Sequence, residues 1–512
     1  MMGETTIQAW YEASPVLEYA GNPLIEAMPP IMSEEDAAER LSNFPPFPDD
    51  ERELPKEIRL HCINRISHLV QPLPIHLELE AVVSSIIRSG YMGRNPMDAA
   101  TWRHLHALSQ RSTSPASTFN STASTFSLVG LSGMGKTTAL KSVLRLLPQV
   151  IKHTRYQGRD LIHTQIVWLK LECPHNGSLA GLCQDFFRAV DAALGDDIHA
   201  HYYKSKRNEA DLIPMMRQVA ATYFIGAIFI DELQHLQVAK ATGKVEMLNF
   251  FVNLINSIGV PVVFIGTNSM VQLFSHIVRN ARRVSGQGIY DFKQPTEEDE
   301  TWDLLLNTMW EYQWVENPTP LTDELKATIY DLTQGVTDFL SKLMILGQRY
   351  AIQSGKERLD EQVFVHIAST KMKLLQPAIA ALRSKDPKQM AMFEDLLPVD
   401  AQMAEMMLDQ LHVIPSNLSV LRAKQARLLS AVTGKDTLQK SLPKPMRAPD
   451  AKKEKGAVSQ PSQHGAITKS GSSRSIPLSA RLTNPTSVVD GLREAGWLVS
   501  DPCEFEPYYR AA

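Results

Sequence analysis

Eight residues constrain this chain more than any other part of it: Gly-Leu-Ser-Gly-Met-Gly-Lys-Thr at positions 130–137. They match the pattern GxxxxGK[ST]. An apolar run precedes them at 126–129, and a helical pattern follows at 137–147. In this setting the glycines let backbone N–H groups wrap phosphates, and the helix N-terminus adds its dipole. The motif therefore predicts a nucleotide-binding loop between a strand and a helix, which is the start of an α/β fold.

Each residue type in the loop has an expected task. We expect Lys136 to reach the β- and γ-phosphates of ATP, and Thr137 to offer its hydroxyl to Mg²⁺. The other expected contacts to the nucleotide come from the same segment: Gly130, Ser132, Gly133, Met134, Gly135 and Thr138.

Short apolar runs alternate with helical patterns between residues 126 and 289. The runs lie at 126–130, 165–172, 227–231 and 261–266. Strands that alternate with helices predict an α/β fold with a parallel sheet covered on both faces. Residues 290–433 are mainly helical in pattern and predict a lid with further C-terminal helices.

The flanking segments differ from this core in composition. Residues 1–55 are rich in proline and acidic residues and predict an N-terminal extension, followed by a helical segment at 56–125. Residues 434–488 hold ten Lys/Arg and three Asp/Glu. Proline, glycine, serine and lysine there predict a disordered basic tether at 434–487. Residues 488–512 regain apolar side chains and predict a partner-docking segment, with a frayed terminus as the alternative.

Two acidic residues end the apolar run at 227–230. We expect Asp231 to hold Mg²⁺, directly or through water, and Glu232 to act as the general base on the attacking water. Glu232 favours hydrolysis of ATP over nucleotide binding alone. A strand that ends in two acids is a weak signal by itself, but it gains weight from the loop at 130–137.

Polar and basic residues follow the next apolar run. Thr267 or Asn268 could contact the attacking water or the γ-phosphate, with ordinary turn residues as the alternative. Arg282 and Arg283 are candidates for an arginine supplied across a subunit interface, which stabilises charge on the γ-phosphate. The alternative for this pair is a solvated basic face.

Composition excludes several other classes of protein. Four cysteines without a CxxC pair argue against a disulfide framework and a structural zinc site. The first residues lack the pattern of a secretory signal, and polar residues interrupt the longest uncharged stretch, 248–274. We therefore expect a cytoplasmic protein without a membrane span. The net charge of −4 shows no global basic footprint for nucleic acid.

Taken together, the loop at 130–137, Asp231-Glu232, Thr267-Asn268 and Arg282-Arg283 resemble an AAA+ ATPase module. Further segments resemble TnsC, the ATP-dependent regulator of transposons with a TnsABC core. These are IRSGYMGRNP (87–96), CPHNGSL (173–179), IDELQHL (230–236), EMLNFFVNLINSIGVPV (246–262) and LTQGVTDFLSKL (332–343). The resemblance covers residues 5–30 and 55–400.

The resemblance implies a function beyond what composition indicates. TnsC proteins bind ATP and double-stranded DNA, form rings or filaments on it, and carry a signal from a target selector (TnsD or TniQ type) to the transposase TnsB and the endonuclease TnsA. It also implies that Lys136, Thr137, Asp231 and Glu232 have the ATPase roles. The C-terminal segment from Val488 to Phe505 would then contact TnsA.

The position of a DNA contact stays open. Lys204, Lys206 and Arg207 lie beside aromatic residues in HYYKSKR and are candidates, with a solvated helix end as the alternative. The main competing function is a STAND-like signalling ATPase that does not bind DNA. A helicase loader and a noncatalytic nucleotide-binding module are weaker alternatives. We identify no acidic triad of a transposase, so we expect no DNA strand cleavage by this chain.

Overall fold

The computed structural model describes residues 6–109, 121–204, 209–238, 286–390 and 415–433, with short stretches at 250–251, 255–256, 258–270 and residue 393. The predicted tether and docking segment, 434–512, lie outside the described residues. The chain divides into two units. The first comprises Met1–His153 and His163–Asp436, and the second comprises Thr154–Ile162 and Thr437–Ala512.

A five-stranded parallel sheet forms the centre of the first unit. Its strand order is β5-β6-β7-β2-β8. The strands are β2 (Thr125–Gly130), β5 (Trp168–Glu172), β6 (Ala227–Asp231), β7 (Val262–Ile265) and β8 (Ile289–Phe292). Parallel strands that are covered on both faces are mainly apolar, and every residue of β2, β6 and β7 is buried.

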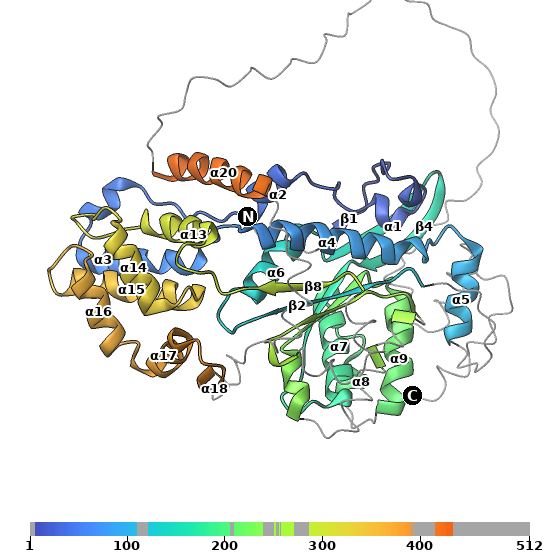
Figure 1. Ribbon diagram of the computed structural model, residues 1–512. Helices are drawn as coiled ribbons and strands as arrows, with labels where there is room; N and C mark the ends of the chain where they lie inside the picture. The colour runs from blue at the N-terminus through green and yellow to red at the C-terminus, as the bar shows by residue number, and fades with distance from the viewer. Residues whose placement is uncertain are drawn as a thin grey trace, which may run out of the picture. The chain divides into compact units, whose positions relative to one another are not determined.

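Successive side chains of these strands enter two different cores. On β6, Phe229 packs into one core, while Ile228 and Ile230 pack into the other. The first core contains α4 (Pro74–Met92) and α6 (Lys136–Leu144), and the second contains α7 (Leu179–Leu194) and α9 (Glu209–Thr222) (Figure 1). Helices thus cover both faces of the sheet, which confirms the predicted α/β fold.

A second, smaller sheet has the order β1-β3-β4. Its strands are β1 (Thr6–Gln8), β3 (Val150–Tyr156) and β4 (Arg159–Ile166). β1 pairs in parallel with β3, with Thr6 opposite Val150. The apolar run predicted as one strand at 165–172 therefore divides at Val167, between β4 and β5. The N-terminal residues contribute a strand to this sheet and do not form a separate body.

The segment IRSGYMGRNP ends α4, and its side chains form hydrogen bonds with the residues just before β6. The Tyr91 hydroxyl donates to the carbonyl of Phe224 at 2.9 Å, and the Arg94 guanidinium donates to that of Ile225 at 2.7 Å. Both side chains are fully buried. A Cβ at Gly90 would lie 2.7 Å from the Pro261 ring, so only glycine fits this close approach. The motif thus has a packing role.

Helices follow the sheet in the chain and form the lid. They are α13 (Glu300–Trp310), α14 (Asp323–Thr333), α15 (Thr337–Gln353), α16 (Glu361–Thr370) and α17 (Gln376–Ser384). α3 (Lys56–Cys62) and η3 (Ile63–His68) from the N-terminal part pack on α15. α20 (Pro415–Thr433) packs against α2 (Glu34–Leu41) and α13. The lid is therefore tied to residues that come more than two hundred positions earlier.

The other helices in the described part of the chain are short or peripheral. They are α1 (Pro23–Glu26), α5 (Ala99–Ser109), α8 (Ala200–Tyr203), α18 (Pro387–Met390) and the 3-10 helices η1 (Leu17–Tyr19), η2 (Asp49–Glu53), η4 (Leu233–Val238) and η5 (Lys373–Leu375). Among the described helices, none combines the length and the apolar character needed to cross a bilayer.

Candidate functional site

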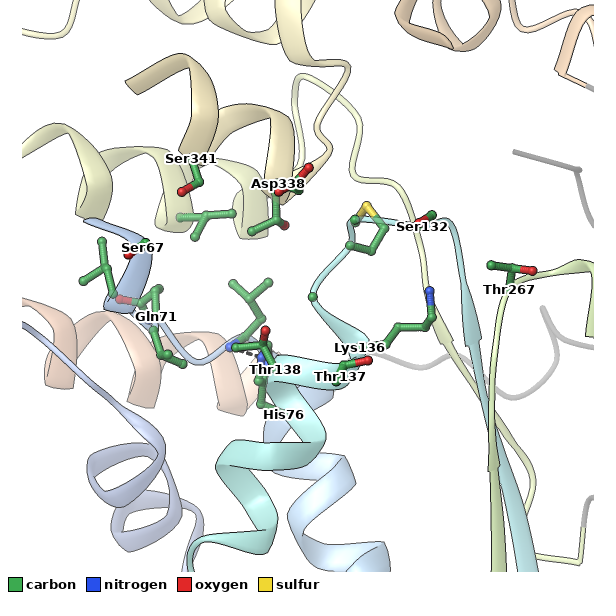
Figure 2. A pocket seen from close by; sticks show the side chains of 18 of the residues that line it. Ser67, Gln71, His76, Ser132, Lys136, Thr137, Thr138, Thr267, Asp338 and Ser341 are labelled. Carbon is green, nitrogen blue, oxygen red and sulfur yellow. Dashed lines mark hydrogen bonds between the residues drawn. The ribbon is translucent and has the colours of Figure 1, made fainter. Parts of the chain in front are cut away.

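A cavity of about 370 Å³ lies where the carboxyl ends of the central strands meet the lid. This volume is in the usual range for small-molecule sites. Its walls come from the loop at 132–138, from the ends of β6 and β7, from α13 and α15 of the lid, and from the N-terminal residues between 66 and 76. Figure 2 shows Lys136, Thr137 and Thr138 in its middle, with Asp338 and Ser341 of the lid on one side.

The loop at 130–137 has the shape that its sequence predicts. Gly135 has φ of 93°, a left-handed conformation that favours glycine, and it caps the N-terminus of α6. The Lys136 ammonium donates to the carbonyls of Gly130 at 2.9 Å and Leu131 at 2.8 Å. The loop therefore holds its own lysine on backbone oxygens. A phosphate is a stronger acceptor for an ammonium group and could replace them.

Gly130 allows two strands to pair closely and is not among the residues that line the cavity. A Cβ at this position would lie 2.7 Å from the carbonyl oxygen of Phe292 on β8. Ser132, Gly133, Met134, Gly135, Lys136, Thr137 and Thr138 line the cavity. The first glycine of the motif thus lets β8 pair closely with β2, while the later residues surround the space for a ligand.

Asp231 lies at the end of β6 and meets the loop directly. Its Oδ2 accepts from the Thr137 hydroxyl at 3.0 Å and lies 2.8 Å from the Lys170 ammonium. Lys170 is on β5 and was not predicted from sequence, because a lysine inside a short strand carries no motif. A hydroxyl and a carboxylate oxygen at this separation suit the oxygen-only preference of Mg²⁺. The described residues hold no cluster of three or more His, Cys, Asp or Glu side chains arranged to bind a metal ion.

Glu232 and Thr267 lie on neighbouring strand ends and both line the cavity. Glu232 has φ of 57°, which is uncommon for a residue other than glycine. Gln234 connects the two, because its side-chain amide bonds the Glu232 carboxylate and the Thr267 backbone N–H. The Asn268 Oδ1 is buried and has no hydrogen-bond partner among the described residues. Thr267 lines the cavity and Asn268 is not among its lining residues, so Thr267 is better placed to contact a ligand.

Residues of the N-terminal part line one side of the cavity, and the sequence did not predict them. His76 lines the cavity, and its Nδ1 accepts from the Leu73 N–H at 3.1 Å. Burial lowers the pKa of His76 from 6.5 to about 4, so its ring is neutral at pH 7. Gln71 also lines the cavity and accepts from the Thr308 hydroxyl at 2.9 Å. Neither residue belongs to a nucleotide-binding sequence pattern, so only the fold identifies them.

The lid touches the loop through its backbone. The N–H of Asp338, in the first turn of α15, donates to the Gly133 carbonyl at 3.0 Å. The Asp338 carboxylate pairs with Lys342 on the same helix. This contact closes one end of the cavity, and it explains how lid residues come to line a site built on the sheet.

The remaining predicted residues lie away from the cavity or outside the described part. Lys204 follows α8, is exposed, and lies 6.0 Å from the Tyr203 ring. Lys206, Arg207, Arg282 and Arg283 fall outside the described residues. The assignments of a DNA contact and of an arginine acting in trans therefore stay predictions.

Comparisons with known proteins give one family match and several solved structures of low similarity. The AAA domain family matches residues 119–274. No curated protein matches the chain. Among solved structures, a Walker-type ATPase of Pyrococcus abyssi is 13% identical, with a TM-score of 0.32, over 63% of this chain and 94% of that one. Cdc6p from Pyrobaculum aerophilum is 11% identical, with a TM-score of 0.30, over 46% and 57% of the two chains.

A further similar structure is the RuvB Holliday junction branch migration motor of Thermotoga maritima. It is 13% identical, with a TM-score of 0.27, over 54% of this chain and 67% of that chain. The family match spans β2, the loop, β6 and β7, which are the elements that build the cavity floor. Residues 119–274 thus match an AAA domain, and the parallel sheet with its phosphate-binding loop between β2 and α6 has the fold of a P-loop NTPase.

Proposed function

We propose that this protein is an ATP-dependent, DNA-binding regulator of transposition of the TnsC type. The observation that carries the ATPase part is one cavity in which Lys136 and Thr137 lie beside Asp231, Glu232 and Thr267. A phosphate-binding loop, a pair of acids and a polar strand end are the groups that hydrolysis of a nucleotide requires.

The proposed roles follow from position. Lys136 leaves the carbonyls of Gly130 and Leu131 and binds the terminal phosphates. Thr137 and Asp231 would hold Mg²⁺, since their oxygens already lie 3.0 Å apart. The ion would supply positive charge beside the phosphates of the nucleotide. Glu232 orients water and accepts its proton, and Thr267 contacts the γ-phosphate or that water.

The regulatory part of the proposal depends on the TnsC-like sequence segments. In this proposal the protein forms homo-oligomers on target DNA after a TnsD- or TniQ-type selector loads it, and it then engages TnsB and TnsA. The segment 488–512 contacts TnsA, and Arg282 or Arg283 acts on the ATP of a neighbouring subunit. Phosphate contacts made once per subunit are enough to follow a duplex without reading its sequence.

Electron microscopy with double-stranded DNA tests the proposal. We expect rings or filaments on DNA with a nonhydrolysable ATP analogue and not with ADP. Lys136→Ala should abolish binding of a fluorescent ATP analogue and assembly. Lys141→Ala is a matched control, because Lys141 is exposed on the same helix. Protein that stays monomeric on DNA with ATP analogue and target selector would contradict the proposal and favour a signalling switch.

A further inference from the structure

The side chain of Gln234 joins the ends of two strands in the cavity. Its Nε2 donates to the Oε2 of Glu232, and its Oε1 accepts from the Thr267 N–H at 3.2 Å. Gln234 itself is only 6% exposed. Both ends of one buried amide are therefore used, one on the acid of β6 and the other on the polar end of β7.

The backbone around Gln234 fixes where this amide can reach. Glu232 adopts a left-handed backbone conformation, which costs a residue with a Cβ roughly 1–2 kcal/mol. This turn ends β6 and starts η4, where Leu233 and Leu236 are fully buried. The burial of these two leucines fixes the position of η4, and the side chain of Gln234 then lies against the Glu232 carboxylate. Strain of this kind is found where a surrounding structure holds a functional side chain.

The neighbouring strand end leaves room for the amide. A Cβ built on Gly266 would lie 2.6 Å from the Gln234 Oε1. The glycine before Thr267 thus allows the carboxamide to reach the Thr267 N–H. A larger residue at 266 would push the carboxamide away, so the contact depends on residues from three positions: 234, 266 and 267.

We propose that Gln234 is a positioning residue that orients the Glu232 carboxylate and couples it to the end of β7. This inference rests on the proposed function, in which Glu232 accepts the proton of the attacking water. With Oε2 held by Gln234, the other carboxylate oxygen is directed toward the water. If the γ-phosphate moves Thr267, the amide transmits that movement to Glu232.

Two variants at Gln234 test this role through rates and binding. Gln234→Met keeps the length of the side chain and removes both polar contacts. Gln234→Glu keeps the acceptor for Thr267 but replaces the donor to Glu232 with a second carboxylate. We expect both to lower kcat for ATP hydrolysis at least tenfold, since a general base contributes 10²–10⁴-fold. For Gln234→Met, which adds no charge to the cavity, the Kd of a fluorescent ATP analogue should change less than about threefold. Gln234→Glu adds a negative charge to the cavity wall and should also weaken binding of the analogue.

Gln218→Met is the control, since Gln218 is exposed on α9. A double-mutant cycle separates positioning from a merely structural role. In the Glu232→Gln background, Gln234→Met should cause little further loss of rate, because its effect acts through Glu232. Circular dichroism and thermal unfolding check that each variant is folded.

The outcomes distinguish this inference from the function on which it rests. If wild-type protein with DNA hydrolyses ATP and Gln234→Met is equally fast, the role of Gln234 is wrong and the ATPase stands. An equal loss of rate in the wild-type and Glu232→Gln backgrounds would also overturn it. If wild-type protein with DNA and target selector binds ATP without hydrolysing it, both the proposed ATPase and the role of Gln234 fail.

Discussion

At the scale of single residues, one carboxylate oxygen of Asp231 interacts with two partners. Its Oδ2 accepts from the Thr137 hydroxyl and pairs with the Lys170 ammonium, 2.8 Å away. The side chains of Asp231 and Lys170 are 5% and 16% exposed. A buried carboxylate without a counter-charge is costly, so Lys170 stabilises Asp231 when no divalent cation is bound. A magnesium ion on Thr137 and Asp231 would meet this ammonium and be repelled by it.

Lys170→Met should therefore lower the Mg²⁺ concentration that gives half-maximal binding of a fluorescent ATP analogue. We expect a shift of roughly fivefold, equivalent to about 1 kcal/mol of removed repulsion. A magnesium titration at fixed nucleotide measures it. Lys152→Met, which changes an exposed lysine on β3, should leave the titration unchanged. A higher magnesium requirement in Lys170→Met would show that the ammonium assists the ion.

At the scale of elements, a chain of hydrogen bonds ties the N-terminal residues to the small sheet. The Tyr11 hydroxyl bonds the Nδ1 of His153 at 2.8 Å, and the Nε2 of His153 bonds the Oε1 of Gln165 at 2.8 Å. Gln165 donates to the Leu24 carbonyl at 3.0 Å. Burial lowers the pKa of His153 from 6.5 to about 4. Between pH 4 and pH 6.5 the ring is therefore neutral in the folded protein, whereas the same ring binds a proton in the unfolded chain.

Acid should therefore destabilise this junction at pH values well above the pKa of ordinary carboxyl groups. Between pH 6.5 and 4 the unfolded state binds more protons than the folded state, so the free energy of unfolding falls as pH falls. For His153 the expected loss between pH 7 and 5 is about 2 kcal/mol. Urea midpoints at pH 7, 6 and 5 measure it, and His153→Gln should show a weaker pH dependence. His61→Gln, at an exposed site on α3, should keep the wild-type dependence.

The same elements show how far the sequence could predict the fold. Strands β2, β6 and β7 were predictable because they are short, mainly apolar runs that are buried on both faces. The break at Val167 was not, since the apolar residues 166–169 continue without interruption across the change of sheet. β8 was also missed, because only Phe292 of its four residues is buried.

In the site, the loop at 130–137 and the pair Asp231-Glu232 could be predicted, because each is a local sequence pattern. His76, Lys170 and Gln234 were not assigned, because their roles come from contacts between distant elements.

At the scale of the first unit as a whole, the N-terminal residues hold the lid as well as the sheet. Arg59 on α3 is almost fully buried and donates to both carboxylate oxygens of Glu357, at 2.7 and 2.9 Å. It also donates to the Trp314 carbonyl at 3.0 Å. Glu357 follows α15, the helix whose first turn contacts the loop at Gly133. The ion pair thus fixes the far end of a helix whose near end closes the cavity.

Arg59→Met should lower stability by about 2–3 kcal/mol, since it removes the cationic partner of the partly buried Glu357 carboxylate and leaves it only the Glu316 N–H as a donor among the bonds described. Arg358→Met, which removes an exposed arginine paired with Asp360, should cost no more than about 1 kcal/mol. Urea unfolding compares the two, and titration with a fluorescent ATP analogue shows whether a loosened lid weakens binding.

The double variant Arg59→Met/Glu357→Leu isolates the cause of any loss. Removing both charges replaces an ion pair by apolar groups, which is often neutral for stability. We therefore expect the double variant to be more stable than Arg59→Met alone and to regain affinity for the ATP analogue. If the double variant is as unstable as the single one, packing of the Arg59 stem and its bond to Trp314, not the charge pair, holds the lid. The lid position would then not depend on the ion pair and should be insensitive to salt.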